Sequence, residues 1–128
     1  MPALVVASIF ALLLSPQDAE KTLDGNWGGN HVGIEVDAKE VRFEFDCAHG
    51  TTGAIRLAAD GRFDVAGIFV RERPGPTRPE GDRGEAARYS GRIEGDTMTL
   101  TVETTNPAET IGTYTVQRGR LPRLRKCQ

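Results

Sequence analysis

The stretch HVGIEVDAKEVRFEFDC, from His31 to Cys47, alternates apolar and polar side chains on both sides of a short polar segment at 37–40. The apolar positions are Val32, Ile34 and Val36 before that segment, and Val41, Phe43, Phe45 and Cys47 after it. An antiparallel hairpin that turns at 37–40 pairs Val36 with Val41, Ile34 with Phe43 and Val32 with Phe45 on one face. The other face then sets Glu35 opposite Arg42. A slip of one residue would turn the phenylalanines toward water, so this register is well specified.

The same alternation predicts two further hairpins. Their expected pairs are Leu57 with Phe63 and Ile55 with Val65 across a three-residue loop at Gly61, and Ile93 with Met98 and Gly91 with Leu100 across Gly95-Asp96. With an entry strand at 26–29 and a last long strand at 111–118, the chain should hold seven or eight sequential antiparallel strands and no helix. We predict an all-β fold, a small antiparallel meander closed into a barrel, because closure removes exposed strand edges. A two-sheet sandwich is the alternative.

The inward face of such a barrel raises the question of what fills it. Its predicted residues are Val32, Ile34, Phe43, Phe45, Ile55, Leu57, Phe63, Val65, Ile93, Met98, Leu100 and Val116. Eight strands enclose just enough space to be filled by side chains or to hold one small ligand. For a barrel of this length we favour a packed core, in which only the inward glycines at 53, 67, 91 and 112 leave room. If the barrel binds a small apolar ligand, the Pro- and Gly-rich segment 71–84 is the natural lid. The predicted ligand-binding residues are Phe43, Phe45, Phe63, Tyr89, Leu100 and Tyr114.

The N-terminus and the two cysteines predict the compartment. An uncharged apolar run, 3–14, indicates a signal peptide over residues 1–19, followed by one barrel domain at 20–128. A buried core segment is the alternative for that run, and about a dozen apolar residues are too few to cross a bilayer. Export and an even cysteine count predict a disulfide between Cys47 and Cys127, in a periplasmic or secreted protein.

Charge and motifs narrow the function classes. Lys and Arg number 16 against 18 Asp and Glu, which predicts no nucleic-acid partner. The short apolar run predicts no stable membrane insertion. The C-terminal residues Arg118, Arg120, Arg123, Arg125 and Lys126 form a basic stripe, expected to be solvated, with phosphate groups as the alternative partner. No nucleophile elbow, phosphate loop or metalloprotease pattern occurs, so we predict a non-enzymatic protein without a cofactor. If the core is packed, the alternative function is a protein-interaction module of the cell envelope.

The two histidines form the best candidate for a metal site. In the predicted register His31 faces Asp46 on the outer face, and His49 lies within one turn of that carboxylate. Imidazole and carboxylate ligands suit Zn or Cu. The alternative, which we favour, is a surface His–Asp pair without metal. Cys47 is expected to be oxidised in the disulfide, which argues against a catalytic pair with His49.

Residues Gly25-Asn26-Trp27 and Arg118 resemble the Gly-x-Trp motif and the closing arginine of lipocalin-type (calycin) barrels. The resemblance implies that Arg118 packs across the indole of Trp27 and seals one end of the barrel by a cation–π contact.

Two other resemblances concern secretion. The motifs Trp27-Gly-Gly, Phe45-Asp-Cys-Ala-His-Gly50, Tyr89-Ser-Gly91 and Leu124-Arg-Lys-Cys127 are similar to those of an uncharacterised family of small secreted bacterial β-barrel proteins. Glu85-Ala-Ala-Arg-Tyr89 resembles the Ser-Gly-x-x-Tyr inhibitory loop of periplasmic inhibitors of c-type lysozyme, without its Ser-Gly pair. This second resemblance implies a tyrosine presented to a protein partner.

Overall fold

The structure is a computed structural model of the chain, and it describes residues 21–72 and 84–127. The predicted signal peptide at 1–19 lies outside the described residues. So does most of the segment 71–84 that was expected to act as a lid, and neither prediction is tested.

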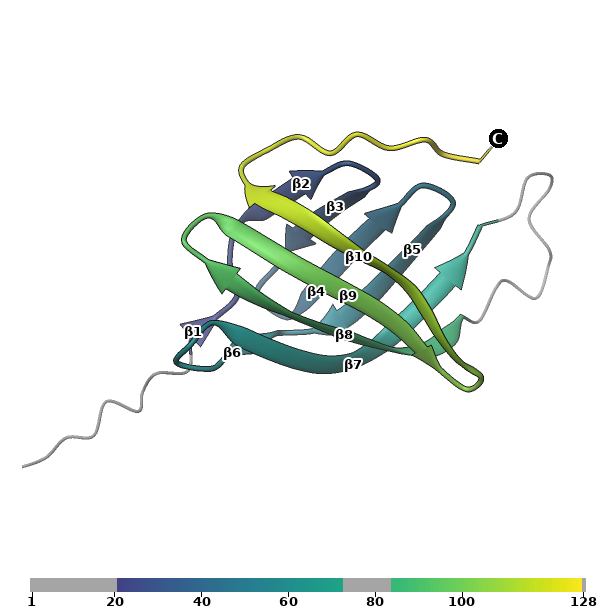
Figure 1. The fold of residues 1–128 in the computed structure, drawn as a ribbon, viewed down its shortest axis with the longest axis horizontal. Helices are drawn as coiled ribbons and strands as arrows, with labels where there is room; N and C mark the ends of the chain where they lie inside the picture. Colours follow the sequence, from purple (N-terminus) through teal and green to yellow (C-terminus); the bar gives the residue numbers. More distant parts are fainter. Residues whose placement is uncertain (1–20, 73–83, 128) are drawn as a thin grey trace, which may run out of the picture.

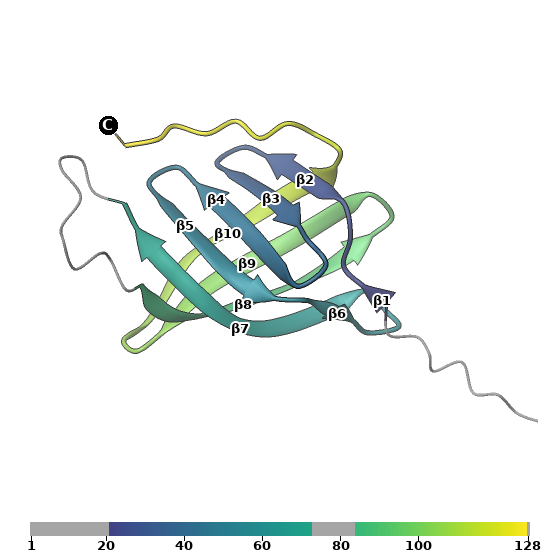
Figure 2. The same cartoon turned by 180° about the vertical axis from the view of Figure 1, so that it is seen from behind.

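Eight strands close into an antiparallel barrel in the order β10-β2-β3-β4-β5-β7-β8-β9. Figures 1 and 2 show it from opposite sides. The bounds are β2 Asn26–Gly29, β3 Val32–Val36, β4 Glu40–Phe45, β5 Ala48–Gly53, β7 Arg62–Arg71, β8 Glu85–Glu94, β9 Thr97–Thr105 and β10 Ala108–Arg118. Two short strands, β1 Lys21–Thr22 and β6 Arg56–Leu57, pair with each other at one end of the barrel. The predicted all-β barrel is confirmed. Within the described ranges no helix is present that is long and apolar enough to span a membrane.

The hairpin that decided the prediction has the expected register. Ile34 lies opposite Phe43, and Glu35 lies opposite Arg42 on the outer face. The Arg42 guanidinium is 3.6 Å from the Glu35 carboxylate. The β8–β9 hairpin also has its predicted register, with Ile93 opposite Met98. The rule that apolar residues pair across neighbouring strands therefore predicted both registers correctly.

The hairpin predicted before β7 forms its turn but not its ladder. The Ala58 amide donates to the Arg62 carbonyl at 2.9 Å, and Gly61 has the predicted left-handed conformation with a φ of 84°. The structure does not contain the pairs of Leu57 with Phe63 and of Ile55 with Val65. Instead β7 pairs with β5, with Thr52 opposite Gly67. Leu57 lies opposite Lys21 of β1. The predicted register was based only on which side chains face inward. That criterion could not reveal that the two-residue strand β1 pairs with β6 at the end of the barrel.

The inward side chains form one hydrophobic core. Among the predicted inward residues, only Leu57, Val65 and Ile93 are partly buried, and the others are buried. The core also contains Leu23, Trp27, Val41, Ala48, Phe69, Ala87, Tyr89 and Val102.

The barrel closes where β10 meets β2, through Gln117 opposite Gly28 and Arg118 opposite Trp27. Gly119 follows with a φ of 78°, a left-handed conformation that glycine adopts without steric cost, and there the chain leaves β10. Residues 119–127, which we call the strap, then run outside the barrel past the β2–β3 turn to the β4–β5 turn. The strap is the yellow trace along one edge of the molecule in Figure 1.

The strap ends in the predicted disulfide, which is confirmed. Cys47, in the β4–β5 turn, is bonded to Cys127, and their Cα atoms are 5.2 Å apart. A disulfide is consistent with an oxidising, extracytoplasmic compartment.

Candidate functional site

The six residues predicted to bind a ligand pack against one another inside the barrel. Phe43, Phe45, Phe63, Tyr89 and Leu100 are buried, and Tyr114 is partly buried. The rings of Phe43 and Tyr89 are stacked with centroids 4.3 Å apart, and those of Phe45 and Tyr114 are 5.3 Å apart. Aromatic pairs at these separations are favourable beyond the area that they bury. These side chains therefore form contacts with one another that a ligand would have to replace.

Tyr89 occupies the space over two inward glycines. Its hydroxyl donates a hydrogen bond to the Ile68 carbonyl at 2.8 Å. A Cβ atom at Gly50 would collide with this hydroxyl, and one at Gly67 would lie 3.1 Å from the ring. Burial of the ring raises the pKa of Tyr89 above its ordinary range. The phenol is thus a packed and hydrogen-bonded part of the core.

Two further aromatic rings fill the other inward glycine positions. A Cβ atom at Gly91 would lie 2.9 Å from Cζ of Phe63, and one at Gly112 would lie 3.0 Å from the hydroxyl of Tyr114. The expectation that glycines 67, 91 and 112 leave room is therefore wrong, because an aromatic ring covers each of them. Gly53 does have nothing within 4 Å of a Cβ position, and it is exposed. The interior has the character of a packed core.

Trp27 and Arg118 form the contact implied by the lipocalin resemblance. The Arg118 guanidinium lies over the indole, 4.4 Å from the ring centroid. It also binds the Asp24 carboxylate at 2.8 Å and the Asp96 carboxylate at 3.2 Å. The indole nitrogen of Trp27 donates to the Asp24 carbonyl at 2.9 Å. One cluster thus ties the start of β2, the β8–β9 turn and the end of β10.

The strap lies directly on two glycines of the barrel wall. A Cβ atom at Gly28 would collide with the carbonyl oxygen of Arg120, and one at Gly33 would lie 2.8 Å from the Pro122 ring. Both glycines face outward, and because they have no side chains the strap can lie directly against the backbone of β2 and β3. This close approach would be blocked by any other residue.

Hydrogen bonds from the strap backbone hold it along its length. The Arg123 amide donates to the Gly29 carbonyl at 3.0 Å, and the His31 amide donates to the Arg123 carbonyl at 2.8 Å. The Arg125 amide donates to the Asp46 carboxylate at 2.8 Å. Burial alone would raise the pKa of Asp46, but the Arg125 amide and the His31 ring outweigh it and hold that pKa below its ordinary value.

Lys126 locks the far end of the strap. Its ammonium group donates to the Phe45 carbonyl at 2.9 Å and lies 2.7 Å from the Glu44 carboxylate and 3.0 Å from the Glu72 carboxylate. The Glu72 carboxylate also binds His49 at 2.9 Å. Burial opposes ionisation of Glu72, yet the His49 and Lys126 hydrogen bonds prevail and lower its pKa.

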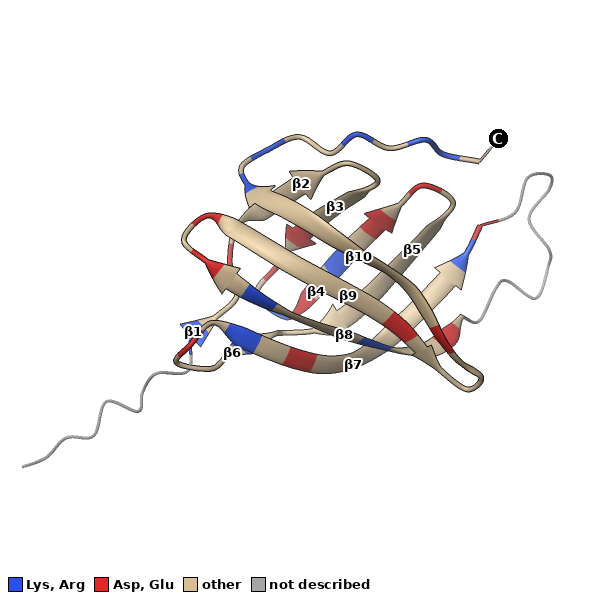
Figure 3. Ribbon diagram, viewed as in Figure 1, with Lys and Arg blue, Asp and Glu red and all other residues tan. Residues whose placement is uncertain are grey.

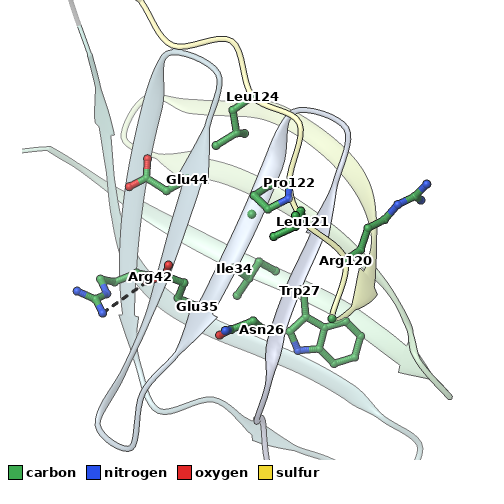
Figure 4. Close-up of a pocket in the computed structure, with 12 residues that line it drawn as sticks. Asn26, Trp27, Ile34, Glu35, Arg42, Glu44, Arg120, Leu121, Pro122 and Leu124 are labelled. Carbon is green, nitrogen blue, oxygen red and sulfur yellow. Dashed lines mark ion pairs between the residues drawn. The ribbon is translucent and has the colours of Figure 1, made fainter.

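A groove of about 520 Å³ lies between the strap and the outer face of β2, β3 and β4. Figure 4 shows that the strap contributes Leu121, Pro122 and Leu124, whereas the barrel contributes Glu35, Arg42 and Glu44. Leu121 is 85% exposed, which is unusual for a large apolar side chain, and Leu124 is half-buried. The strap side therefore presents mainly apolar side chains beside Arg120, and the barrel side combines charged side chains with Trp27 and Ile34. Such a groove suits a molecule that has an apolar part and a polar head.

The predicted His31–Asp46 contact exists, with Nδ1 of the ring 2.6 Å from the carboxylate. His49 does not join it, because it binds Glu72 instead. The histidines thus form two separate pairs, both on groups that hold the strap. Among residues 21–72 and 84–127, no three His, Cys, Asp or Glu side chains are grouped as a metal ion would need.

The segment that resembles a lysozyme-inhibitory loop is part of strand β8. Its Tyr89 is fully buried, so the side chain that the resemblance presents to a partner is directed into the core. Glu85 at its start binds Arg71 at 2.8 Å.

Sequence reasoning missed the groove. Its apolar wall has three strap residues, Leu121, Pro122 and Leu124, which follow no alternating pattern. The available signal was the pair of outward glycines, Gly28 and Gly33, next to a tail that a disulfide returns to the barrel.

Comparisons with protein families, with curated proteins and with solved structures found no match for this chain. The family resemblances therefore stay predictions. The fold and site define a closed eight-stranded barrel with a disulfide-tied strap that covers one wall.

Proposed function

We propose that this chain is a non-enzymatic binding protein of the periplasm or the cell exterior, and that it holds a small amphipathic molecule in the groove beneath the strap. The proposal rests on the contrast between the interior of the barrel and the groove outside it. The aromatic side chains of the barrel interior are packed against one another, whereas the groove outside it is open.

The dimensions and lining of the groove support a small ligand. Its volume, about 520 Å³, falls within the range of pockets that bind small molecules. Leu121 and Leu124 offer an apolar wall for a chain or ring. On the opposite wall Glu35 is paired with Arg42 and Glu44 with Lys126, and these ion pairs offer charged groups to a polar head. Secretion is supported by the predicted signal peptide and by the disulfide.

The proposal is tested by titration with N-phenyl-1-naphthylamine, an apolar dye whose emission rises on binding. We expect saturable binding to the oxidised protein, and we expect Leu124→Ser to weaken it about tenfold, because half-burial of a leucine against the dye is lost. The matched control is Ile68→Ser on the outer face of β7, where Ile68 is 45% exposed and remote from the groove. That control should bind as the wild type does.

A variant of the core distinguishes the interior from the groove. Leu100→Ala would open a cavity among the buried aromatic rings. If this variant raises dye binding while Leu124→Ser leaves it unchanged, the ligand belongs inside the barrel and the proposal is wrong. Absence of saturable binding to the wild type would also contradict it.

The second candidate is an interaction module of the cell envelope. One observation favours it: the basic side chains on the outside of the strap, Arg120, Arg123 and Arg125, are exposed.

A further inference from the structure

The side chains of the strap point alternately toward the barrel and away from it. Pro122 lies on Gly33, Leu124 lines the groove and Lys126 binds carbonyls of the β4–β5 turn. The side chains between them, Arg123 and Arg125, are exposed, as is Leu121. The strap therefore has an inner edge that is used for packing and an outer edge that is directed to solvent.

The cations at the two ends of the stripe are neutralised. Arg118 binds Asp24 and Asp96, and Lys126 binds Glu44 and Glu72.

The arginines between those ends have no carboxylate partner in the part of the chain that the structure describes. Within residues 21–72 and 84–127, the ion pairs include no guanidinium of Arg120, Arg123 or Arg125, although the charge of Arg125 acts on the nearby Asp46. In Figure 3 the charged residues of the strap are all basic, and uncharged residues lie between them. A local excess of positive charge thus exists on a protein whose net charge is −2.

The backbone of this edge is held in place before any partner arrives. The Arg123 amide and carbonyl are both hydrogen-bonded to the β2–β3 turn, the Arg125 amide is bound to Asp46, and Cys127 is covalently tied to Cys47. Figures 1 and 2 both show the strap along the outside of one edge of the molecule, where a flat surface could approach it. Little backbone entropy is lost when such an edge binds.

We propose that the outer edge of the strap, Arg120, Leu121, Arg123 and Arg125, is a docking surface for a membrane rich in anionic phospholipid. The three guanidinium groups bind lipid phosphates, and Leu121 enters the boundary between headgroups and acyl chains. Leu121 is 85% exposed and lies among arginines without carboxylate partners. An exposed apolar side chain beside cationic groups suits the surface of an anionic membrane. This contact is peripheral and reversible.

The test is co-sedimentation of the oxidised protein with vesicles of phosphatidylcholine, with and without phosphatidylglycerol. We expect binding only to the anionic vesicles, and we expect it to weaken as salt is raised. Replacing all three arginines by glutamine (R120Q, R123Q and R125Q) should lower the partition coefficient roughly a hundredfold, since each cation near an anionic surface contributes about fivefold. Replacing them by lysine should retain most of the binding.

A matched control removes the same charge elsewhere. Arg62, Arg88 and Arg92 are exposed on the outer face of β7 and β8, and each is paired with a carboxylate. Replacing these three by glutamine should leave vesicle binding within about twofold of the wild type, because their charges are already compensated. Circular dichroism would verify that both triple variants keep the fold.

Three results would overturn the proposal. One is equal binding to neutral and anionic vesicles, and another is an equal loss in the two triple variants. The third is binding to inorganic polyphosphate or single-stranded DNA as tightly as to vesicles, with no effect of Leu121→Ser. That outcome would assign the edge to a soluble polyanion. Arg120 and Leu121 also line the groove, whereas Arg123 and Arg125 lie outside its lining. Vesicle binding of the double variant R123Q and R125Q therefore tests the membrane edge alone, and the dye titration with Leu124→Ser tests the ligand site.

Discussion

At the scale of single residues, a tyrosine side chain fills the space that a glycine on another strand leaves in the core. Gly50 has no side chain, and the hydroxyl of Tyr89 takes that space on its way to the Ile68 carbonyl. The cost of a glycine in a strand is thus offset by an aromatic ring that packs over it.

This contact predicts that two glycines of strand β5 differ in how much their replacement by alanine changes the free energy of unfolding. Gly50→Ala should lower the free energy of unfolding by about 1–3 kcal/mol, because its methyl group collides with Tyr89. Gly53→Ala should change it by less than about 0.5 kcal/mol, since nothing lies within 4 Å of the added atom. Urea unfolding of both variants measures the difference. Equal losses would contradict the assignment of Tyr89 to the space above Gly50.

Arg118 predicts a second effect at this scale. Arg118→Ala removes the cation–π contact with Trp27 and the bonds to Asp24 and Asp96, and it should cost about 1–2 kcal/mol. Emission of Trp27, the one tryptophan of the chain, should move to longer wavelength as water reaches the indole. Arg92→Ala, a surface arginine paired with Glu94, is the control and should change neither quantity. An unshifted emission in the Arg118 variant would show that the guanidinium does not cover the ring.

At the scale of elements, the strap depends on two carboxylates, Asp46 and Glu72, which both have depressed pKa values in the folded protein. The unfolded chain therefore binds more protons than the folded chain at acidic pH. Stability from these groups is complete above their ordinary pKa values, 3.8 and 4.5, and it is lost as pH falls through the folded values.

The pH dependence is checked by urea unfolding between neutral pH and about pH 3. We expect the free energy of unfolding to decline as pH falls through this acidic range. Glu72→Gln should be less stable at neutral pH and should show a shallower decline, because one of the titrating carboxyls is gone. A variant with the same slope as the wild type would exclude Glu72 as a source of the acid sensitivity.

The elements also show what sequence reasoning can and cannot supply. The register of β3 with β4 was predictable because a slip of one residue would expose Phe43 and Phe45 to water. The local alternation of apolar and polar residues is enough to show this cost. The pairing of β6 with β1 was not predictable, because β1 has only two residues and no pattern of its own. The groove and the Glu72 partner of His49 depend on contacts between distant segments, and local alternation carries no information on them.

At the scale of the whole molecule, the disulfide joins residues 80 positions apart. Replacing both cysteines by serine frees the unfolded chain from this closure. It should lower the free energy of unfolding by roughly 4 kcal/mol and the melting temperature by about 15–20 °C. Scanning calorimetry of the oxidised protein and the double variant measures both. A loss below about 1 kcal/mol would mean that the strap is held by its hydrogen bonds and ion pairs alone.

The barrel seam has a kinetic consequence. Strand β10 is joined to β2 by a short ladder at Gln117 and Arg118, while its ladder with β9 spans nearly its whole length. Transient opening should begin at this seam, and the β2 amides should exchange with deuterated water before those of β9. The strap, residues 119–127, remains as a tether whose extended reach is only about 30 Å. The separated edges thus stay at a high effective concentration for each other, which favours reclosure within one molecule over exchange of strands between two.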